Sequence, residues 1–230
     1  MRSSGKGAWW TGTIATTVVA LTLTGCSREI AGAAQPDPRQ AGVAVSADGF
    51  GIVAGFADAP VQLEIFTEPQ CTHCAHLQAT FGEDIKRHIE FGDIAVTYRP
   101  MTFLDDEYDI DYSAVVSNAL FLAVDSSTTA ATFQTFVEEL WANQDLSFVD
   151  YTDEDFADIG HDSGLSDAVV ERISEGDAAV DTDDLALENQ NLLSDESPES
   201  PGTPVVYNLK QEETIDISDA DWLDHLLKTV

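Results

Sequence analysis

The chain has 230 residues, of which 10 are lysine or arginine and 42 are aspartate or glutamate, so its formal net charge at pH 7 is -32. A surface this acidic repels nucleic acid and anionic lipid, which argues against either as a direct partner. Its length suits one domain of moderate size with a hydrophobic core, and we interpret the acidic residues as a source of solubility.

The N-terminal residues 1–25 have the layout of a secretory signal peptide. Arg2 and Lys6 form a short positive region, and residues 8–23 are uncharged. This stretch is shorter than the roughly 20 residues that a membrane-spanning helix needs. The sequence LTGC that ends at Cys26 resembles a bacterial lipobox, which would make Cys26 the lipidated first residue of the mature protein. The alternatives are plain secretion and an uncleaved anchor.

The next segments predict a tether followed by the first strands of a domain. Residues 26–42 are rich in Ala, Gly, Pro and Gln and lack periodicity, which is typical of a flexible tether. A short strand is predicted at 43–45 and a turn at 57–60. Residues 61–67, VQLEIFT, alternate at first between apolar and polar side chains and predict a strand.

The stretch QCTHCAH at residues 70–76 contains Cys71 and Cys74, which leaves Cys26 as the third cysteine of the chain. One cysteine pair in an oxidising compartment is compatible with a redox pair, part of a metal site or a structural disulfide. A zinc knuckle would need a second cysteine pair. Haem attachment would need histidine directly after the second cysteine. The two cysteines and two histidines of this stretch are too close in sequence for good tetrahedral metal geometry.

A helix is predicted to begin at or just after Cys71, because apolar residues downstream recur at helical spacing: Cys74, Leu77, Phe81, Ile85 and Ile89. At that position, free N–H groups and the helix dipole stabilise a thiolate. A second strand is predicted at 94–98 after the turn at 92–93, so the order is strand, helix, strand. A CxxC motif in a βαβ unit is typical of a thioredoxin-like redox site.

The middle of the chain predicts several helices that we interpret as core-forming. One covers 113–124, and a weaker one covers 180–193. Thr152 and Ser166 are candidate N-caps of two short helices that Gly160 and Gly164 separate. Another helix is indicated by one apolar face: Phe133, Phe136, Val137, Leu140 and Trp141.

The C-terminal part predicts a strand at 202–207, entered through Pro204, and a partner strand at 213–217. Ser218 is then expected to cap a terminal helix, with Asp221 in the capping-box position. The predicted fold class is α/β, with βαβ and ββα halves around a central mixed sheet. The halves cover 43–110 and 195–230, and an inserted helical subdomain covers 111–194.

Three stretches resemble the DsbA-like branch of the thioredoxin superfamily, in a secreted lipoprotein form. DAPVQLEIFTEPQCTHC is similar to the strand that leads into the family's CxxC motif. YSAVVSNALFLA and TFQTFVEELWANQ look like its inserted helices, and GTPVVYNL looks like its proline loop and following strand. Together they span roughly residues 43–228.

The resemblance implies a thioredoxin-like fold in which a cis Pro204 lies beside the CxxC motif. Cys71 would be the nucleophile and Cys74 the resolving cysteine, with no cofactor. His73 occupies the position that is histidine in oxidising relatives, which points to an oxidase. Thr203 and Pro204, with Thr72 inside the motif, would contact the substrate.

One departure from the family concerns the group that carries the proton. Related proteins often place a buried acid six residues before the first cysteine, and that position is Ile65 here. Glu64 is one residue away and should face the other way if the strand alternates. Glu68 is acidic but is expected in the loop. The sequence therefore leaves the proton-carrying group undefined.

We predict a monomeric thiol–disulfide oxidoreductase, lipid-anchored to the outer face of the cytoplasmic membrane, that forms disulfides in reduced or unfolded exported proteins. Its recycling partner would be a DsbB-like or vitamin K epoxide reductase-like membrane protein. One alternative is a reductase fed by a membrane electron donor. Others are a non-catalytic binding lipoprotein in which the cysteines form a structural disulfide, and a copper-handling protein.

Overall fold

The structure is a computed structural model that describes residues 39–144, 151–199 and 202–228. The predicted signal peptide, Cys26 and the first part of the tether lie outside the described residues. Among the helices of the described ranges, none is both long and apolar enough to cross a membrane.

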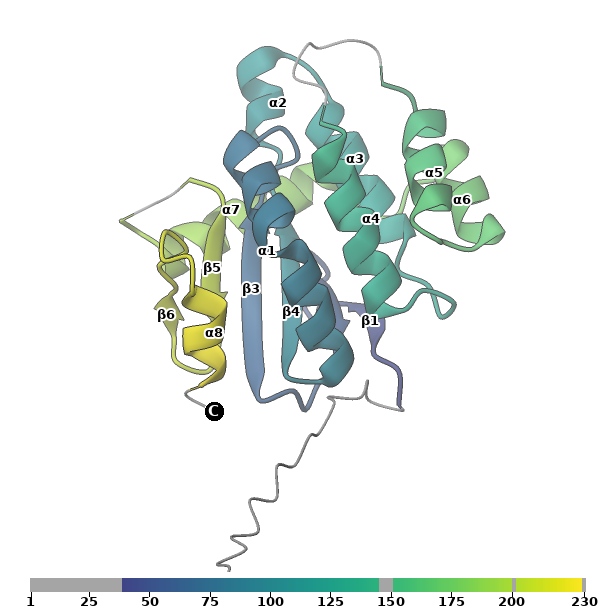
Figure 1. Cartoon of the computed structure of the whole chain (residues 1–230). Helices are drawn as coiled ribbons and strands as arrows, with labels where there is room; N and C mark the ends of the chain where they lie inside the picture. Colours follow the sequence, from purple (N-terminus) through teal and green to yellow (C-terminus); the bar gives the residue numbers. More distant parts are fainter. Residues whose placement is uncertain (1–38, 145–150, 200–201, 229–230) are drawn as a thin grey trace, which may run out of the picture. The chain divides into compact units, whose positions relative to one another are not determined.

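A six-stranded mixed sheet forms the centre of the fold, in the order β1-β2-β4-β3-β5-β6 (Figure 1). Its strands are β1 (Gly42–Val45), β2 (Ile52–Gly55), β3 (Val61–Thr67), β4 (Ile94–Pro100), β5 (Val205–Asn208) and β6 (Glu213–Thr214). Strands β3 and β4 pair in parallel, and the other neighbouring pairs are antiparallel. Helix α1 (Thr72–Phe91) connects β3 to β4. The predicted α/β class and the predicted βαβ unit are confirmed.

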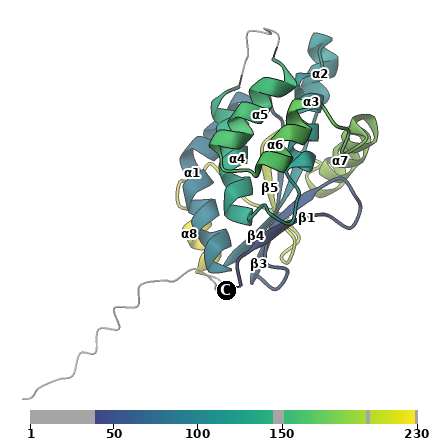
Figure 2. The ribbon, with the colours of Figure 1, turned by 90° about the vertical axis from the view of Figure 1, so that its right-hand side faces the viewer.

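Helices cover both faces of the sheet. Helix α1 and α4 (Ala130–Ala142) lie on one face, and α7 (Thr182–Glu196) lies on the other (Figure 2). The apolar face predicted for α4 is buried. The C-terminal helix α8 (Trp222–Leu227) lies against α1, where the Trp222 ring meets the edge of Phe81 with 5.5 Å between ring centroids. Both faces of the sheet are therefore removed from water, which is the usual arrangement for a sheet with parallel strands.

The helices inserted between β4 and β5 run from Phe103 to Glu196, which is a wider segment than the predicted 111–194. In addition to α4 and α7, this segment contains α2 (Phe103–Tyr108), α3 (Tyr112–Leu122), α5 (Asp153–Asp162) and α6 (Asp167–Ser174). Helix α2 was not predicted, because six residues are too short to show a helical period.

The predicted N-caps of α5 and α6 differ in their outcome. Thr152 forms a full capping box with Asp155 at the start of α5. Ser166 precedes α6, but its side chain makes no capping hydrogen bond. Gly160 lies inside α5 and not between the two helices, and it is Gly164 that takes a positive φ of 90° in the turn.

Several predicted boundaries in the terminal regions are wrong. Strand β1 begins at Gly42, one residue before the predicted strand, and β2 was missed because it is only four residues long and ends in a glycine. Strand β6 is shorter than the predicted 213–217. Ser218 does not cap the last helix: its hydroxyl donates to the Asp216 carboxylate at 2.6 Å, and the helix begins after Asp221. Short polar side chains form such local turns readily and thereby compete with a helix cap.

Candidate active site

The CxxC motif lies where β3 ends and α1 begins. Cys71 is the N-cap residue of α1 and is partly buried, whereas the side chain of Cys74, in the first turn, is fully buried. Both cysteines are free thiols in this structure. Gln144, just after α4, donates its amide N–H groups to the carbonyls of Pro69 (2.6 Å) and Cys71 (3.0 Å). The loop that carries the motif is thus fixed by both the preceding strand and the inserted helices.

The thiol of Cys71 is strongly acidic, with a pKa lowered to about 5. The largest cause is a hydrogen bond from the Cys74 thiol, which outweighs the opposing effect of burial; the Cys74 and His73 backbones and the Thr203 side chain lower the pKa further. Hydrogen bonds donated to a thiolate favour the charged form. Cys71 is therefore a thiolate at neutral pH and can act as a nucleophile.

Cys74 has the opposite character, because burial raises its pKa well above the ordinary value and the neighbouring Cys71 thiolate raises it further. The backbone N–H of Glu68 lies 3.5 Å from its Sγ atom and partly opposes this shift. The pair thus consists of an accessible thiolate and a buried neutral thiol.

Thr203 and Pro204 lie beside Cys71, and the peptide bond between them is cis. The Cys71 thiol donates a hydrogen bond to the Thr203 carbonyl at 3.3 Å. The Thr203 hydroxyl is buried, and it lowers the pKa of Cys71. A carbonyl can only accept a hydrogen bond, so it cannot stabilise a thiolate, whereas a hydroxyl can donate to one. The Thr203 hydroxyl is therefore a hydrogen-bond donor for the charged form of Cys71.

We expect Thr203→Val to raise the pKa of Cys71 by about one unit, because the variant removes this hydroxyl donor. The measurement is the alkylation rate of the reduced chain by iodoacetamide as a function of pH, in a Cys26→Ser background. The parent should show a midpoint near pH 5. Thr203→Ser keeps the hydroxyl and should retain the parental midpoint. A midpoint that does not move in the valine variant would show that the hydroxyl does not act on the thiolate.

The other predicted residues of the motif are exposed. His73 contributes to the low pKa of Cys71 through its backbone. Thr72 begins α1 and lines a pocket toward α4, away from Thr203. The structure therefore brings Cys71, Cys74, Thr203 and Pro204 together, with Thr72 facing a different side of the motif.

An apolar groove of about 470 Å³ lies between α1 and the proline loop. Its lining includes His73, Leu77, Phe81, Pro204 and Ile217. An extended peptide that approaches Cys71 could place apolar side chains in this groove.

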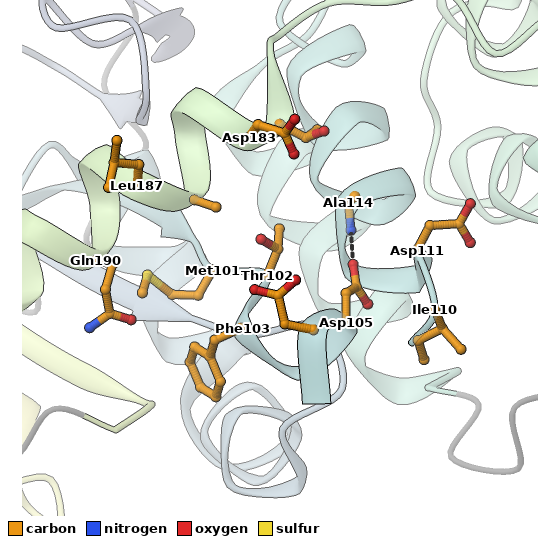
Figure 3. Close-up of a pocket in the computed structure, with 13 residues that line it drawn as sticks. Met101, Thr102, Phe103, Asp105, Ile110, Asp111, Ala114, Asp183, Leu187 and Gln190 are labelled. Carbon is orange, nitrogen blue, oxygen red and sulfur yellow. Dashed lines mark hydrogen bonds between the residues drawn. The ribbon is translucent and has the colours of Figure 1, made fainter. Parts of the chain in front are cut away.

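A second pocket, of about 600 Å³, lies between α2, α3 and α7. Figure 3 shows Leu187, Gln190, Met101 and Phe103 on one side of the view and Ala114, Asp111 and Ile110 on the other. Asp105 stands at its edge, where its carboxylate accepts a hydrogen bond from the Ala114 backbone N–H at 2.8 Å.

Glu68 is a buried acid close to the cysteine pair, whereas the sequence predicts only that it lies in the loop. Its side chain is fully buried. Burial raises its pKa to about 8; hydrogen bonds from Ser113 and the Gln70 backbone lower the pKa, and the charges of Asp105 and Cys71 raise it. The only local indication in the sequence that an acid could serve the cysteine pair is the position of Glu68 in TEPQC, three residues before Cys71. Its burial depends on residues that arrive much later in the chain.

Glu64 faces away from the cysteine pair and is neutralised by Arg99, which donates from Nη2 at 2.6 Å and from Nε at 2.7 Å. The Nη1 atom of Arg99 also pairs with Asp48 at 2.8 Å. Both Glu64 and Arg99 are buried. Glu64 is therefore part of a buried ion pair within the sheet, and it is not available to exchange protons with the cysteines.

In the ranges that the structure describes, no three histidine, cysteine, aspartate or glutamate side chains are close enough together to hold a metal ion. The two histidines and two cysteines of the CxxC region do not converge on one point.

Comparison with known proteins identifies the fold and the family. The family model described as thioredoxin matches residues 48–207. MdbA, a thiol-disulfide oxidoreductase from Corynebacterium diphtheriae, is 26 % identical and superposes with a TM-score of 0.66 over 83 % of this chain and 95 % of that chain. MdbA from Corynebacterium matruchotii is 22 % identical, with a TM-score of 0.68 over 81 % of this chain and 91 % of that chain.

A curated relative is the serine/threonine-protein kinase PknE of Mycobacterium tuberculosis, which is 23 % identical over 181 residues. The match covers 77 % of this chain and 31 % of the kinase. The chain thus spans about a third of the length of the curated relatives it matches.

Proposed function

This chain belongs to the thioredoxin family, and from that premise we propose that it carries out thiol–disulfide exchange on exported proteins, chiefly to form disulfides. Cys71 is the nucleophile and Cys74 is the resolving cysteine. The observation that supports this most directly is the difference in acidity between the two thiols: the pKa of Cys71 is lowered to about 5, whereas that of Cys74 is raised. A structural disulfide has no need of such a difference.

Oxidation of a substrate proceeds in two exchanges. A substrate thiolate attacks the sulfur of Cys71, which is the more accessible one, and the Cys71–Cys74 bond breaks as a mixed disulfide forms. The sulfur of Cys74 leaves with the electron pair and takes up a proton. A second substrate thiolate then attacks the substrate sulfur, and Cys71 leaves as a thiolate. The substrate has lost two electrons, and the cysteine pair has gained them.

Glu68 is the group that exchanges a proton with Cys74. Its carboxyl group is buried, its backbone N–H lies 3.5 Å from the Cys74 Sγ atom, and a carboxyl group with a pKa of about 8 can both give and accept a proton near neutral pH. In the oxidising direction Glu68 supplies the proton that Cys74 takes up. When Cys74 attacks the mixed disulfide in the reverse direction, Glu68 accepts that proton.

The substrate lies as an extended peptide against Thr203 and Pro204, with side chains in the apolar groove. Backbone groups of the loop at Thr203 pair with the peptide in a strand-like manner, which allows many sequences to bind. This arrangement suits reduced or unfolded proteins, which expose both backbone groups and apolar side chains.

The chain acts outside the cytoplasm, held at the outer face of the cytoplasmic membrane through lipid on Cys26. Because oxidation of substrate leaves Cys71 and Cys74 reduced, a membrane partner of the DsbB-like or vitamin K epoxide reductase-like kind must accept the electrons. The acidic surface opposes direct contact with anionic lipid, so the anchor and the partner provide the association with the membrane.

The direction of exchange can be tested by the reduction potential of the pair. We expect a value between about -120 and -180 mV in glutathione buffers, because a stable Cys71 thiolate favours the reduced form and makes the disulfide a strong oxidant. The readout is alkylation and mass measurement of the full chain in a Cys26→Ser background. A value near or below about -270 mV with rapid exchange would instead make the protein a reductase. An absence of exchange would leave only a structural disulfide in a binding protein.

A further inference from the structure

A buried hydrogen-bond network joins the inserted helices to the loop that carries the cysteine pair. Glu68 belongs to this loop, and Ser113 belongs to α3; both side chains are fully buried. The Ser113 hydroxyl donates a hydrogen bond to Oε1 of Glu68, and the backbone N–H of Gln70 donates to Oε2 at 2.7 Å. Each oxygen of this carboxyl group therefore accepts one hydrogen bond.

The neighbours of Ser113 leave its hydroxyl hydrogen available for the ionised Glu68. The amide nitrogen of Gln70 lies 2.9 Å from the Ser113 hydroxyl oxygen and can only donate to it. A hydroxyl has one hydrogen, so while its oxygen accepts from Gln70, that hydrogen remains available for Glu68. Ser113 therefore acts as a donor toward the carboxylate.

Asp105 of α2 holds this arrangement in place. Its Oδ1 accepts from the Gln70 amide at 2.8 Å and from the Ser113 backbone N–H at 2.9 Å. Its Oδ2 accepts from the Ala114 backbone N–H (Figure 3). One carboxylate thus orients both Gln70 and the start of α3, and it lies at the edge of the pocket between α2 and α7.

Ser113 and Asp105 have opposite electrostatic effects on Glu68. The hydroxyl hydrogen bond favours the charged carboxylate, whereas the negative charge of Asp105 disfavours it. The other charged group that acts on Glu68 is the Cys71 thiolate at the start of α1, and the Gln70 backbone contributes a neutral donor. The inserted helices therefore supply one group that favours ionisation and one that opposes it.

We propose that Ser113 and Asp105 are positioning residues that set the protonation of Glu68 from opposite sides, so that the inserted helices determine the pH at which Cys74 can give up its proton. This inference rests on the proposed function, in which Glu68 accepts the Cys74 proton. In the reducing direction the proton moves from the Cys74 sulfur to the Glu68 carboxylate. The Cys74 thiolate then attacks Cys71, and the substrate sulfur leaves with the electron pair.

The test uses the full-length chain in a Cys26→Ser background and two opposed variants. The resolving rate, measured as release of a substrate thiol from a preformed mixed disulfide at Cys71, should rise with pH as Glu68 loses its proton. Ser113→Ala should move this profile about one pH unit higher, because it removes a donor to the carboxylate. Asp105→Asn should move it lower, because it removes a nearby negative charge. Carbon NMR of the labelled Glu68 carboxyl in the oxidised chain should show shifts of the same signs.

The controls separate this effect from a loss of packing. Ser117→Ala removes an equally buried hydroxyl one turn along α3, whose hydrogen bond goes to the Ser113 carbonyl, and should leave the profile unchanged. Ser113→Thr retains the hydroxyl and should stay near the parental profile.

Shifts of the same sign in both variants, or profiles equal to that of Ser117→Ala, would overturn the inference. If Ser113→Ala does not fold, Asp105→Asn alone tests the inference. A pH profile of the resolving rate that stays in place or moves to higher pH in this variant contradicts it. If the parental chain shows no exchange at all, the proposed function fails, and the Glu68 titration by NMR still shows whether Ser113 and Asp105 act on it.

Discussion

Replacement of Cys74 by alanine will stop exchange at the mixed disulfide and leave a substrate covalently bound to Cys71. Cys71 keeps its position at the start of α1, and the helix N–H groups still favour its thiolate. Its pKa will rise, because the hydrogen bond from the Cys74 thiol is the largest cause of its low value. The thiolate will therefore still attack, but no resolving thiol remains to break the adduct. Turnover of a reduced model protein should fall to the uncatalysed background.

The adduct can be measured by non-reducing electrophoresis and intact mass after the variant is mixed with a disulfide-containing peptide. Cys71→Ser is the matched control and should give neither adduct nor turnover, because the fully buried Cys74 thiol cannot reach the peptide. Cys26→Ser should behave as the parent. An adduct that forms through Cys74 in the Cys71→Ser variant would contradict the assignment of the nucleophile.

The cysteine pair could be located from sequence because its determinants are local. The apolar spacing after Cys71 predicted the start of α1, and the residues on either side predicted β3 and β4; the structure confirms each of these elements. A strand that ends at a helix N-terminus places the first cysteine among free N–H groups whatever the rest of the chain does. The chemistry of Cys71 therefore follows from a short stretch of sequence.

The environment of Glu68 could not be predicted, because it depends on residues far along the chain. Its partner Ser113 is 45 residues away in the sequence. The position three residues before Cys71 lies beyond the end of β3, so strand alternation gives no indication of whether it is buried. Only the packing of α2 and α3 against the loop determines that this acid is enclosed.

For Glu64, strand alternation predicts the direction of the side chain but not its partner. Alternation along β3 indicated that its side chain points away from the cysteines, and the structure agrees. The charge that neutralises it comes from Arg99 on the neighbouring strand, and only the register of the parallel pair, which sets Glu64 opposite Thr97, brings the two side chains together. The register between two strands cannot be predicted from the sequence of either strand alone.

Arg99→Leu should destabilise the fold by about 3–5 kcal/mol, because it leaves the buried carboxylate of Glu64 without its cationic partner. Glu64 and Arg99 have exposed fractions of 3 % and 6 %, so water cannot replace the lost ion pair. Glu196 of α7 also acts on Glu64: burial, the charge of Glu64 and a hydrogen bond with Glu64 raise its pKa to about 8, and the charge of Arg99 opposes this shift. Arg99→Leu therefore removes a cation that acts on both carboxyl groups. The measurement is urea unfolding at pH 7, followed by circular dichroism.

Two further variants identify the uncompensated charge as the cause. The double variant Arg99→Leu/Glu64→Leu replaces the ion pair with apolar side chains and should recover most of the lost stability, because the cost of burying two charges disappears with them. Arg87→Leu removes an arginine whose partner Asp84 is 47 % exposed. We expect it to cost less than about 1 kcal/mol, as surface ion pairs do. If the double variant were as unstable as Arg99→Leu, the loss would come from packing of the arginine side chain and not from the unpaired charge.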